Sequence, residues 1–363
     1  MKIVTIIGTR PQFIKAATVS RKLKDFNDMK EIIVHTGQHY DDNMSDIFFK
    51  ELEIPQPDYY LGIGSGSHGV QTAHMLEKIE DVLIKEKPDV VLIYGDTNST
   101  LAGTLAASKL QIPVAHVEAG LRSFNRKMPE EINRIVADHV SDLLFAPTKV
   151  AVNNLINEGI AEDRIYYVGD VMFDAAIFYG EKAGQQSKIL ETLDLKPKEY
   201  ILSTIHRAYN TDIPERLKTI FNALCKIGKD ITIVMPLHPR TKAALLREGL
   251  YEKVSEKLKI IEPVGYLDMV KLEKNAKLII TDSGGVQKEA FFYKVLCVTL
   301  REETEWVELV DLGWNYLVPP DCEKFIEESI RKVLNAPHGL DAEPYGDGKA
   351  AEKIVKVLRK YLL

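Results

Sequence analysis

The chain has 363 residues, which exceeds one ordinary hydrophobic core and suits two domains. Hydrophobic residues make up 45% and charged residues 28%, the balance of a soluble globular protein, and the net charge of −6 argues against a nucleic-acid partner. The apolar runs are of strand length, so the sequence predicts no transmembrane helix and no membrane partner.

The chain opens with MKIVTIIGTRPQ, a short apolar run that leads into a helix without a small-residue cleavage site, so we expect a first strand and not a signal peptide. The cysteines form no CxxC pair, which argues against metal or disulfide scaffolding: Cys225, Cys297 and Cys322. We therefore expect a cytoplasmic protein.

Apolar, β-branched runs then alternate with helical patterns. The expected strands of the first half are KIVTIIG, EIIVHTG, PDVVLIYGD, IPVAHVEAG and DLLFAPT, with helices from about Pro11 to Leu23 and over STLAGTLAASKL. The pattern restarts with YILSTIHR, ITIVMPLHPR, LKIIEPV, KLIITDSGG and VLCVTLR. This alternation predicts an α/β fold of two doubly wound domains, residues 1–170 and 171–347. An amphipathic helix at 348–363 could pack on either domain.

Polar clusters follow most of these strands, among them GTRP, YGDTNS, HVEAGLRS, IHRAYN, LHPRT and DSGG. In open parallel sheets, ligands bind outside the carboxyl ends of the strands. Two such faces opposed across a cleft would hold one extended ligand between them.

The segment TDSGGVQKEA, residues 281–290, joins a predicted strand to a predicted helix through Ser283, Gly284 and Gly285. The glycines leave the backbone N–H groups of the helix N-terminus open, and the helix dipole places about half a positive charge there. This suits a phosphate or diphosphate. The alternative is a plain turn in which Ser283 is the N-cap.

Basic side chains surround the start of the first helix. GTRPQFIK places Pro11 at the helix start behind Thr9 as the cap. Arg10 and Lys15 would there neutralise an anion. The alternative for each is a solvated surface charge.

Acidic side chains end two strands of the first half. Asp96 ends VVLIYGD, Glu118 ends PVAHVE, and MPEEINR supplies Glu130 and Glu131. A carboxylate at the end of a buried strand is costly to desolvate, and several acids on one face suit proton transfer. The alternative is that Asp96 caps the next helix and Glu118 pairs with Arg122.

Histidines end strands of the second half. His206 and Arg207 close ILSTIHR, and His238 stands in PLHPR, so each histidine lies near an arginine, as phosphate or sugar recognition would require. Glu289 lies one to two turns into the helix after SGG. Its carboxylate could accept two ribose hydroxyls or face solvent.

The sequence shows no pattern typical of a metal site, a serine nucleophile or a nicotinamide cofactor. The His and Asp spacings predict no metal site. Ser283 is not in a GxSxG elbow, and SGSHG at 65–69 follows no strand, so we expect no nicotinamide cofactor.

In order, GTRPQFIK, HTGQHY, YGDTNSTLAG, HVEAGLRS, MPEEINR, HPRT and TDSGGVQKEA resemble the motifs of the bacterial and archaeal non-hydrolysing UDP-N-acetylglucosamine 2-epimerases. The resemblance runs from Met1 to about Asn315. It implies a GT-B fold, in which two Rossmann-like domains face a cleft that holds a UDP-sugar, and it implies a homodimer.

The resemblance also implies the reaction. UDP-GlcNAc and UDP-ManNAc interconvert by anti elimination of UDP and re-addition through a 2-acetamidoglucal, without a metal or redox cofactor. The matched catalytic positions are Asp96, Glu118, Glu131 and His206. The matched phosphate and substrate positions are Arg10, Lys15, His238 and the Ser283–Gly284–Gly285 turn, and Glu289 matches the ribose ligand.

Two segments depart from the family pattern. HRAYN carries Tyr209 where we expect Glu, and TEWVE at 304–308 replaces TERPE. The Trp306 version resembles a subgroup that epimerises UDP-2,3-diacetamido-2,3-dideoxy-glucuronate at C2. Its extra carboxylate would need a cation, for which Arg126, Lys127 and Arg301 are candidates or plain surface charges. Both sugars stay open as substrates.

The family's activation by UDP-GlcNAc depends partly on polar residues after TGQH. The chain is more acidic there than we expect, at Tyr40, Asp41, Asp42, Asn43 and Asp46. Acids beside a second diphosphate would repel it, so we predict weak or absent activation.

Three other functions remain in competition. A GT-B glycosyltransferase would share the UDP site but need an acceptor. A hydrolysing epimerase would release free UDP. A non-catalytic nucleotide-sugar sensor would bind UDP without exchanging the C2 proton.

Overall fold

The computed structural model describes residues 1–38, 53 and 56–361. The acidic segment from Tyr40 to Asp46, on which the prediction of weak activation rests, lies outside the described residues. The chain divides into two compact units: Met1–Ala175 with Glu343–Leu363, and Ala176–Ala342. The sequence pattern predicted these divisions after residues 170 and 347.

The first unit is built on a parallel sheet with the strand order β3-β2-β1-β4-β5-β6-β7. Its described strands are β1 (Lys2–Ile7), β2 (Lys30–His35), β3 (Tyr59–Tyr60), β4 (Val90–Tyr94), β5 (Val114–Val117), β6 (Leu143–Ala146) and β7 (Ile165–Tyr167). The central strands are almost wholly buried because helices cover both faces, as their unbroken apolar runs predicted.

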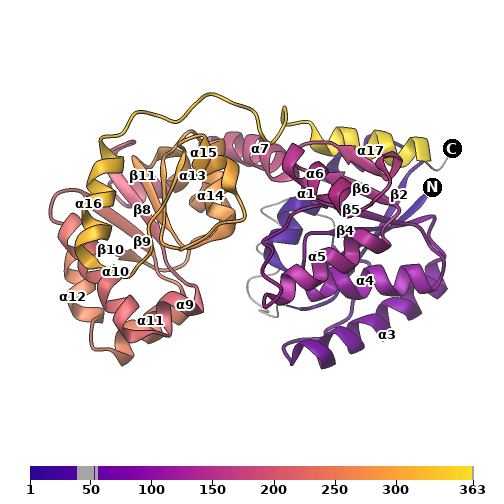
Figure 1. The fold of residues 1–363 in the computed structure, drawn as a ribbon, viewed down its shortest axis with the longest axis horizontal. Helices are drawn as coiled ribbons and strands as arrows, with labels where there is room; N and C mark the ends of the chain where they lie inside the picture. The colour runs from indigo at the N-terminus through magenta and orange to yellow at the C-terminus, as the bar shows by residue number, and fades with distance from the viewer. Residues whose placement is uncertain (39–52, 54–55, 362–363) are drawn as a thin grey trace. The chain divides into compact units, whose positions relative to one another are not determined.

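The helices of the first unit are α1 (Arg10–Leu23), α3 (His68–Glu86), α4 (Asn98–Lys109), α5 (Pro129–Val140), α6 (Lys149–Asn157), the short η1 (Glu162–Arg164) and α17 (Ala350–Tyr361). Figure 1 shows α3, α4 and α5 on one face of the sheet, with α1 and α17 on the other. The amphipathic helix that closes the chain thus packs in the first unit, against α1.

Small residues bring α4 close to the sheet. A Cβ added at Gly103 would lie 2.8 Å from Cδ1 of Ile6, closer than side chains approach one another. Ala102, Ala106 and Ala107 on the same helix are fully buried. This close packing fixes the start of α4, and with it the turn that follows β4.

The second unit is built on a parallel sheet with the order β10-β9-β8-β11-β12-β13. Its described strands are β8 (Tyr200–Thr204), β9 (Thr232–Pro236), β10 (Lys259–Ile261), β11 (Leu278–Thr281), β12 (Cys297–Thr299) and β13 (Asn315–Leu317). Its helices are α8 (Ile189–Thr192), α9 (Ala208–Thr211), α10 (Pro214–Ile227), α11 (Pro239–Arg247), α12 (Tyr251–Lys257), α13 (Tyr266–Asn275), α14 (Gly284–Phe292), α15 (Val307–Asp311) and α16 (Glu323–Leu334). Helix α7 (Val171–Gln186) contains the division between the units.

The α/β class with two doubly wound parallel sheets is confirmed. The sequence did not predict three short strands: β3, β7 and β13. The equally short β10 and β12 were predicted because they lie in longer apolar runs, LKIIEPV and VLCVTLR. No helix in the described parts of the chain is long and apolar enough to cross a membrane.

Candidate active site

The acids of the first unit lie at the carboxyl ends of two neighbouring strands. Asp96 follows β4 and Glu118 follows β5, and Tyr94 pairs with Val117 where these strands end. Gly95 has φ +62° and Glu118 has φ +73°. A left-handed backbone is unusual for glutamate and is typical of functional turns, because the surrounding structure must hold it in place.

Lys15, predicted as a phosphate ligand, contacts the Glu118 carboxylate and is nine-tenths buried. The ammonium and the carboxylate both lie against the backbone of Gly95: an added Cβ would be 3.2 Å from Lys15 Nζ and 3.3 Å from Glu118 Oε2. The expected alternative pairing of Glu118 with Arg122 gives way to this pair, since Arg122 binds Asp138 and Glu158. Removing one partner of a buried ion pair costs about 3–5 kcal/mol.

Asp96 is held by α5. Arg134 donates to Asp96 Oδ2 from Nε at 3.0 Å and from Nη2 at 2.6 Å, and Asn133 donates to the Asp96 backbone carbonyl at 2.9 Å. The Asp96 side chain is 32% exposed to solvent. The protein around it still raises the pKa of Asp96 by desolvation, and Arg134 and Lys15 oppose this rise. Thr97, and not Asp96, accepts the capping bond at the start of α4.

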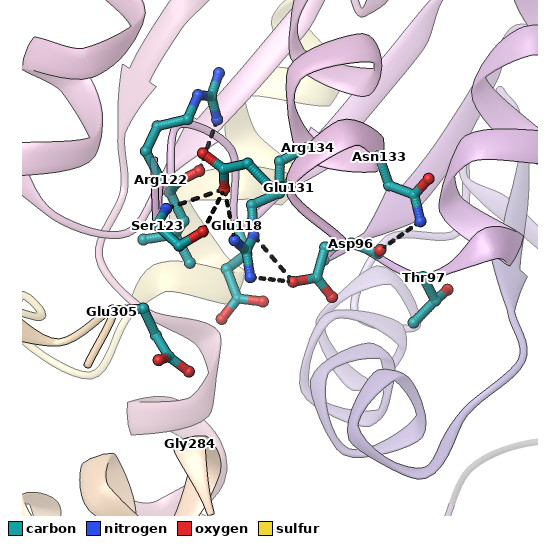
Figure 2. A network of polar contacts seen from close by, with 12 residues as sticks. Asp96, Thr97, Glu118, Arg122, Ser123, Glu131, Asn133, Arg134, Gly284 and Glu305 are labelled. Atoms are coloured by element: carbon teal, nitrogen blue, oxygen red, sulfur yellow. Dashed lines mark hydrogen bonds and ion pairs between the residues drawn. The ribbon is translucent and has the colours of Figure 1, made fainter. Parts of the chain in front are cut away.

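Glu131 occupies the centre of a hydrogen-bonded loop and is 1% exposed. Its carboxylate accepts bonds from Ser123 N at 3.0 Å, Ser123 Oγ at 3.1 Å, Phe124 N at 2.9 Å and Arg134 Nη1 at 2.8 Å. Burial alone would raise the pKa of Glu131, but these donors outweigh it and the pKa is lowered. Figure 2 shows Arg134 between Asp96 and Glu131, with bonds to both.

Arg10 is the first residue of α1 and is half-buried. The turn before it is braced by Gln12, which accepts from Gly8 N at 2.8 Å and donates to the Tyr94 carbonyl at 2.7 Å. Thr9 is the N-cap, as predicted. Gln12 therefore ties the ends of β1 and β4 together.

In the second unit, the fully buried Asp282 organises the turn after β8. It accepts bonds from the backbone N–H groups of His206 at 3.1 Å and Arg207 at 3.0 Å. His206 Nδ1 lies 3.4 Å from Asp282 Oδ1, and the His206 side chain is 39% exposed. The ring of His238 stands 5.5 Å from the ring of His206, and its Nδ1 accepts from Arg240 N at 3.1 Å.

Helix α14 begins at Gly284 with Ser283 as its N-cap, and in the described chain the Ser283 side chain makes no capping hydrogen bond. A Cβ added at Gly284 would lie 2.4 Å from Glu305 Oε1 and 3.6 Å from Arg207 Nη2. A Cβ at Gly285 would meet no described atom within 4 Å. The protein's own atoms therefore leave no room for a side chain at position 284. At Gly285 no described atom restricts a side chain, so its backbone is accessible to a ligand.

Glu305 brings a carboxylate to the start of α14. It accepts from Arg301 Nη1 at 3.0 Å. Burial would raise the pKa of Glu305, but Arg301, a backbone N–H and Arg207 lower it. Trp306 supports the same turn: its Nε1 donates to the Gly284 carbonyl at 3.0 Å, and the Lys288 ammonium lies 4.0 Å from its ring centroid.

Glu289 is 8% exposed, so the alternative of a solvated helix face is wrong. Desolvation raises the pKa of Glu289, and a hydrogen bond of 3.3 Å from the Tyr266 hydroxyl and the nearby Lys288 charge oppose the rise. Tyr266 belongs to α13, so two helices shape the surroundings of this acid.

No metal site emerges from the described residues, 1–38, 53 and 56–361: no group of three or more His, Cys, Asp or Glu side chains there could hold an ion.

Several residues at these positions were absent from the predicted site: Asn133, Arg134, Asp282, Glu305 and Trp306. Asp282 carried a signal, since it ends a buried strand directly before SGG. Asn133 and Arg134 lie in the motif MPEEINR, but nothing in this motif indicates that α5 binds the turn after β4.

Comparisons with known proteins identify the family of this chain. The family model described as UDP-N-acetylglucosamine 2-epimerase matches residues 21–359. A UDP-N-acetylglucosamine 2-epimerase homolog of Methanococcus maripaludis is 57% identical over 99% of both chains. A UDP-2,3-diacetamido-2,3-dideoxy-D-glucuronate 2-epimerase of Pseudomonas aeruginosa is 53% identical, over 99% of this chain and 100% of that protein.

A crystal structure of the UDP-GlcNAc 2-epimerase of Methanocaldococcus jannaschii, in complex with UDP-GlcNAc and UDP, superposes with a TM-score of 0.91. It is 49% identical, and the match covers 99% of this chain and 100% of that chain. The similarity confirms the predicted GT-B fold class. By sequence and by fold, this chain belongs to the UDP-N-acetylglucosamine 2-epimerase family.

Proposed function

We propose that this protein is a non-hydrolysing UDP-sugar 2-epimerase that interconverts UDP-GlcNAc and UDP-ManNAc. The observation that carries the proposal is the group of ion-paired acids Asp96 and Glu118 at the ends of β4 and β5, held by Lys15 and Arg134. Proton transfer at C2 needs acids of this kind, partly desolvated and held in place.

The reaction balances without an external reagent. A base takes the C2 proton while the C1–O bond breaks, and the bonding pair leaves with UDP, so that a C1–C2 double bond forms. In the second half, UDP returns to C1 and a proton reaches C2 from the opposite face. Two acids with different surroundings suit this scheme, and Asp96 and Glu118 differ in exposure and in cationic partner.

Glu131 was predicted as catalytic, but its position supports an indirect role. Its carboxylate is saturated by four donors and is 1% exposed. We propose that it positions Arg134, and through it Asp96, and fixes the loop that begins at Ser123.

The second unit supplies groups suited to UDP. The N-terminus of α14 with the open backbone of Gly285 would take the diphosphate, Glu289 the ribose, and Arg207 and His238 further oxygens. Asp282 orients the His206 ring, so that His206 can meet the leaving oxygen as C1–O breaks. We propose that the positive charge of Arg10 contributes to binding of the diphosphate.

The substrate remains a choice between two sugars, because relatives at 57% and 53% identity are named for different ones. We put UDP-GlcNAc first, since both the 57% identical relative and the jannaschii enzyme are named for it. UDP-2,3-diacetamido-2,3-dideoxy-glucuronate is the second candidate, because the relative of 53% identity is named for it. We also propose a cytoplasmic homodimer that needs no cofactor.

The test is proton NMR of UDP-GlcNAc with the purified protein in D₂O and nothing else. Loss of the C2 proton signal with growth of UDP-ManNAc supports the proposal. Without exchange, the same measurement on the diacetamido-glucuronate sugar distinguishes the second substrate from a sensor. Free UDP that accumulates stoichiometrically indicates a hydrolysing enzyme, and turnover that requires an added acceptor indicates a glycosyltransferase.

Variants assign the acids. Asp96→Asn and Glu118→Gln should each lower turnover by about 100-fold or more and leave UDP affinity nearly intact. Glu130→Gln is the control, because Glu130 is exposed and adjoins Glu131. Near-normal turnover of either variant would remove that acid from the mechanism.

A further inference from the structure

A buried histidine lies directly behind the turn that carries Asp96. His116 is on β5 and is fully buried. Its Nε2 lies 2.7 Å from the Gly95 carbonyl oxygen and its Nδ1 lies 2.7 Å from Asp138 Oδ1. Neither nitrogen faces water, so both ring positions are committed to oxygen atoms of the protein.

These two contacts fix the protons on the ring. A carbonyl oxygen can only accept, so Nε2 must carry a proton. In a neutral ring, Nδ1 would then present a lone pair to Asp138 Oδ1 at 2.7 Å, unless Asp138 were itself protonated.

Asp138 has the surroundings of a carboxylate. Its Oδ2 accepts from Arg122 Nη1 at 2.7 Å and from Gly120 N at 3.0 Å. A guanidinium and a backbone N–H on one oxygen stabilise the ionised carboxyl without any contribution from His116. Arg122 is in turn held beside Asp138 by two bonds of 2.7 Å to Glu158.

We infer that His116 is a buried, doubly protonated positioning residue that holds the turn bearing Asp96. The inference deepens the proposed epimerase function and rests on it for its kinetic consequence. Three successive points of this turn are fixed: the Gly95 carbonyl by His116, the Asp96 carbonyl by Asn133, and the Asp96 carboxylate by Arg134.

One helix provides all three supports. Asn133 and Arg134 lie on α5, and Asp138 on the same helix fixes the imidazole of His116. Figure 2 shows Asn133 and Arg134 reaching Asp96 from this helix. The left-handed Gly95, with φ +62°, is thereby held in one conformation, and with it the direction of the Asp96 side chain.

The protonation state is measured first, on the wild-type protein. In protein labelled with ¹⁵N-histidine, each of the nine histidines contributes one set of ring-nitrogen NMR signals. At pH 8 we expect one histidine with both ring nitrogens protonated, whose signals disappear in His116→Gln. A His116 ring with a single protonated nitrogen would overturn the inference, whatever the enzyme does.

Kinetics then test the positioning role. In His116→Gln the amide can serve only one of the two acceptors, so kcat should fall on the order of 100-fold while KM and UDP affinity change less than about twofold. His74→Gln, at an exposed histidine, is the control. Asp138→Asn should lower kcat less than His116→Gln does, because a neutral His116 can still donate from Nε2 to the Gly95 carbonyl but is held less firmly. Unchanged kcat, or parallel losses of kcat and UDP affinity, would refute positioning.

The two hypotheses fail separately. If wild-type protein exchanges no C2 proton on either UDP-sugar, the proposed function is wrong, while the ¹⁵N spectrum still decides the state of His116.

Discussion

A buried carboxyl group in the second unit makes stability depend on pH in a defined direction. Glu273 on α13 is 1% exposed, and neither carboxyl oxygen has a hydrogen-bond partner among the described residues. Desolvation raises the pKa of Glu273 well above its ordinary value, and the charge of Glu289 raises it further. Burial raises the pKa values of four neighbouring groups, and the charge of Glu273 adds to the rise: Tyr200, Tyr266, Tyr293 and Cys297.

The sign follows from proton binding. Between the unfolded pKa of glutamate and the raised folded pKa, the folded protein holds a proton that the unfolded chain releases. The free energy of unfolding therefore falls as pH rises through this window, by about 1.4 kcal/mol per pH unit. Glu273→Gln removes the titration and keeps the size and polarity of the neutral acid.

We therefore expect Glu273→Gln to be more stable than wild type near neutral pH, with a gain that grows as pH rises from about 5. For a unit of this size the difference in melting temperature should grow by roughly 3–5 °C per pH unit. The assay is tryptophan emission, because both tryptophans, Trp306 and Trp314, are buried in the second unit.

The control is Glu256→Gln at an exposed position on α12, which should leave the pH dependence unchanged. Parallel curves for wild type and Glu273→Gln between pH 5 and 9 would refute the reasoning, because Glu273 would then titrate alike in the folded and unfolded chains.

Three other results are expected. Gly284→Ala should destabilise the second unit and weaken UDP binding, because its Cβ would lie 2.4 Å from Glu305 Oε1. Gly285→Ala should keep the melting temperature of wild type but lose UDP affinity in calorimetry. Equal effects of the two variants on melting temperature would contradict this difference. Trp306→Phe should lose about 1 kcal/mol in urea unfolding, because the bond to the Gly284 carbonyl is removed, and an unchanged midpoint would discount that bond. Initial rates with UDP-GlcNAc should be hyperbolic; a sigmoidal curve would show the activation that the acidic segment was predicted to prevent.

The sequence was sufficient for the fold class because its strands are continuous buried runs of β-branched residues. It also located the polar turns, since chemistry in parallel sheets gathers at the carboxyl ends of strands. Asp96, Glu118, Asp282 and the SGG turn all follow that rule in the structure.

The partners of these residues could not be predicted, because they depend on strand order and helix packing. Lys15 on α1 meets Glu118 only because β1, β4 and β5 are consecutive in the sheet. Arg134 reaches Asp96 only because α5 packs beside the start of α4. Spacing along the chain carries no information on either contact.

Packing within the second unit also accounts for Trp306 in TEWVE, where the family pattern has TERPE. Trp306 is 5% exposed, and its indole N–H and ring are both used within the second unit, on Gly284 and Lys288. Trp306 thus supports the turn at α14, and this role is independent of the group at C6 of a sugar. Arg301 is likewise committed to Glu305. Of the candidate cations for a 6-carboxylate, Arg126 and Lys127 are exposed, on the loop that Glu131 holds at Ser123 and Phe124. We therefore expect the choice between the two sugars to depend on Arg126 and Lys127 in that loop and not on Trp306.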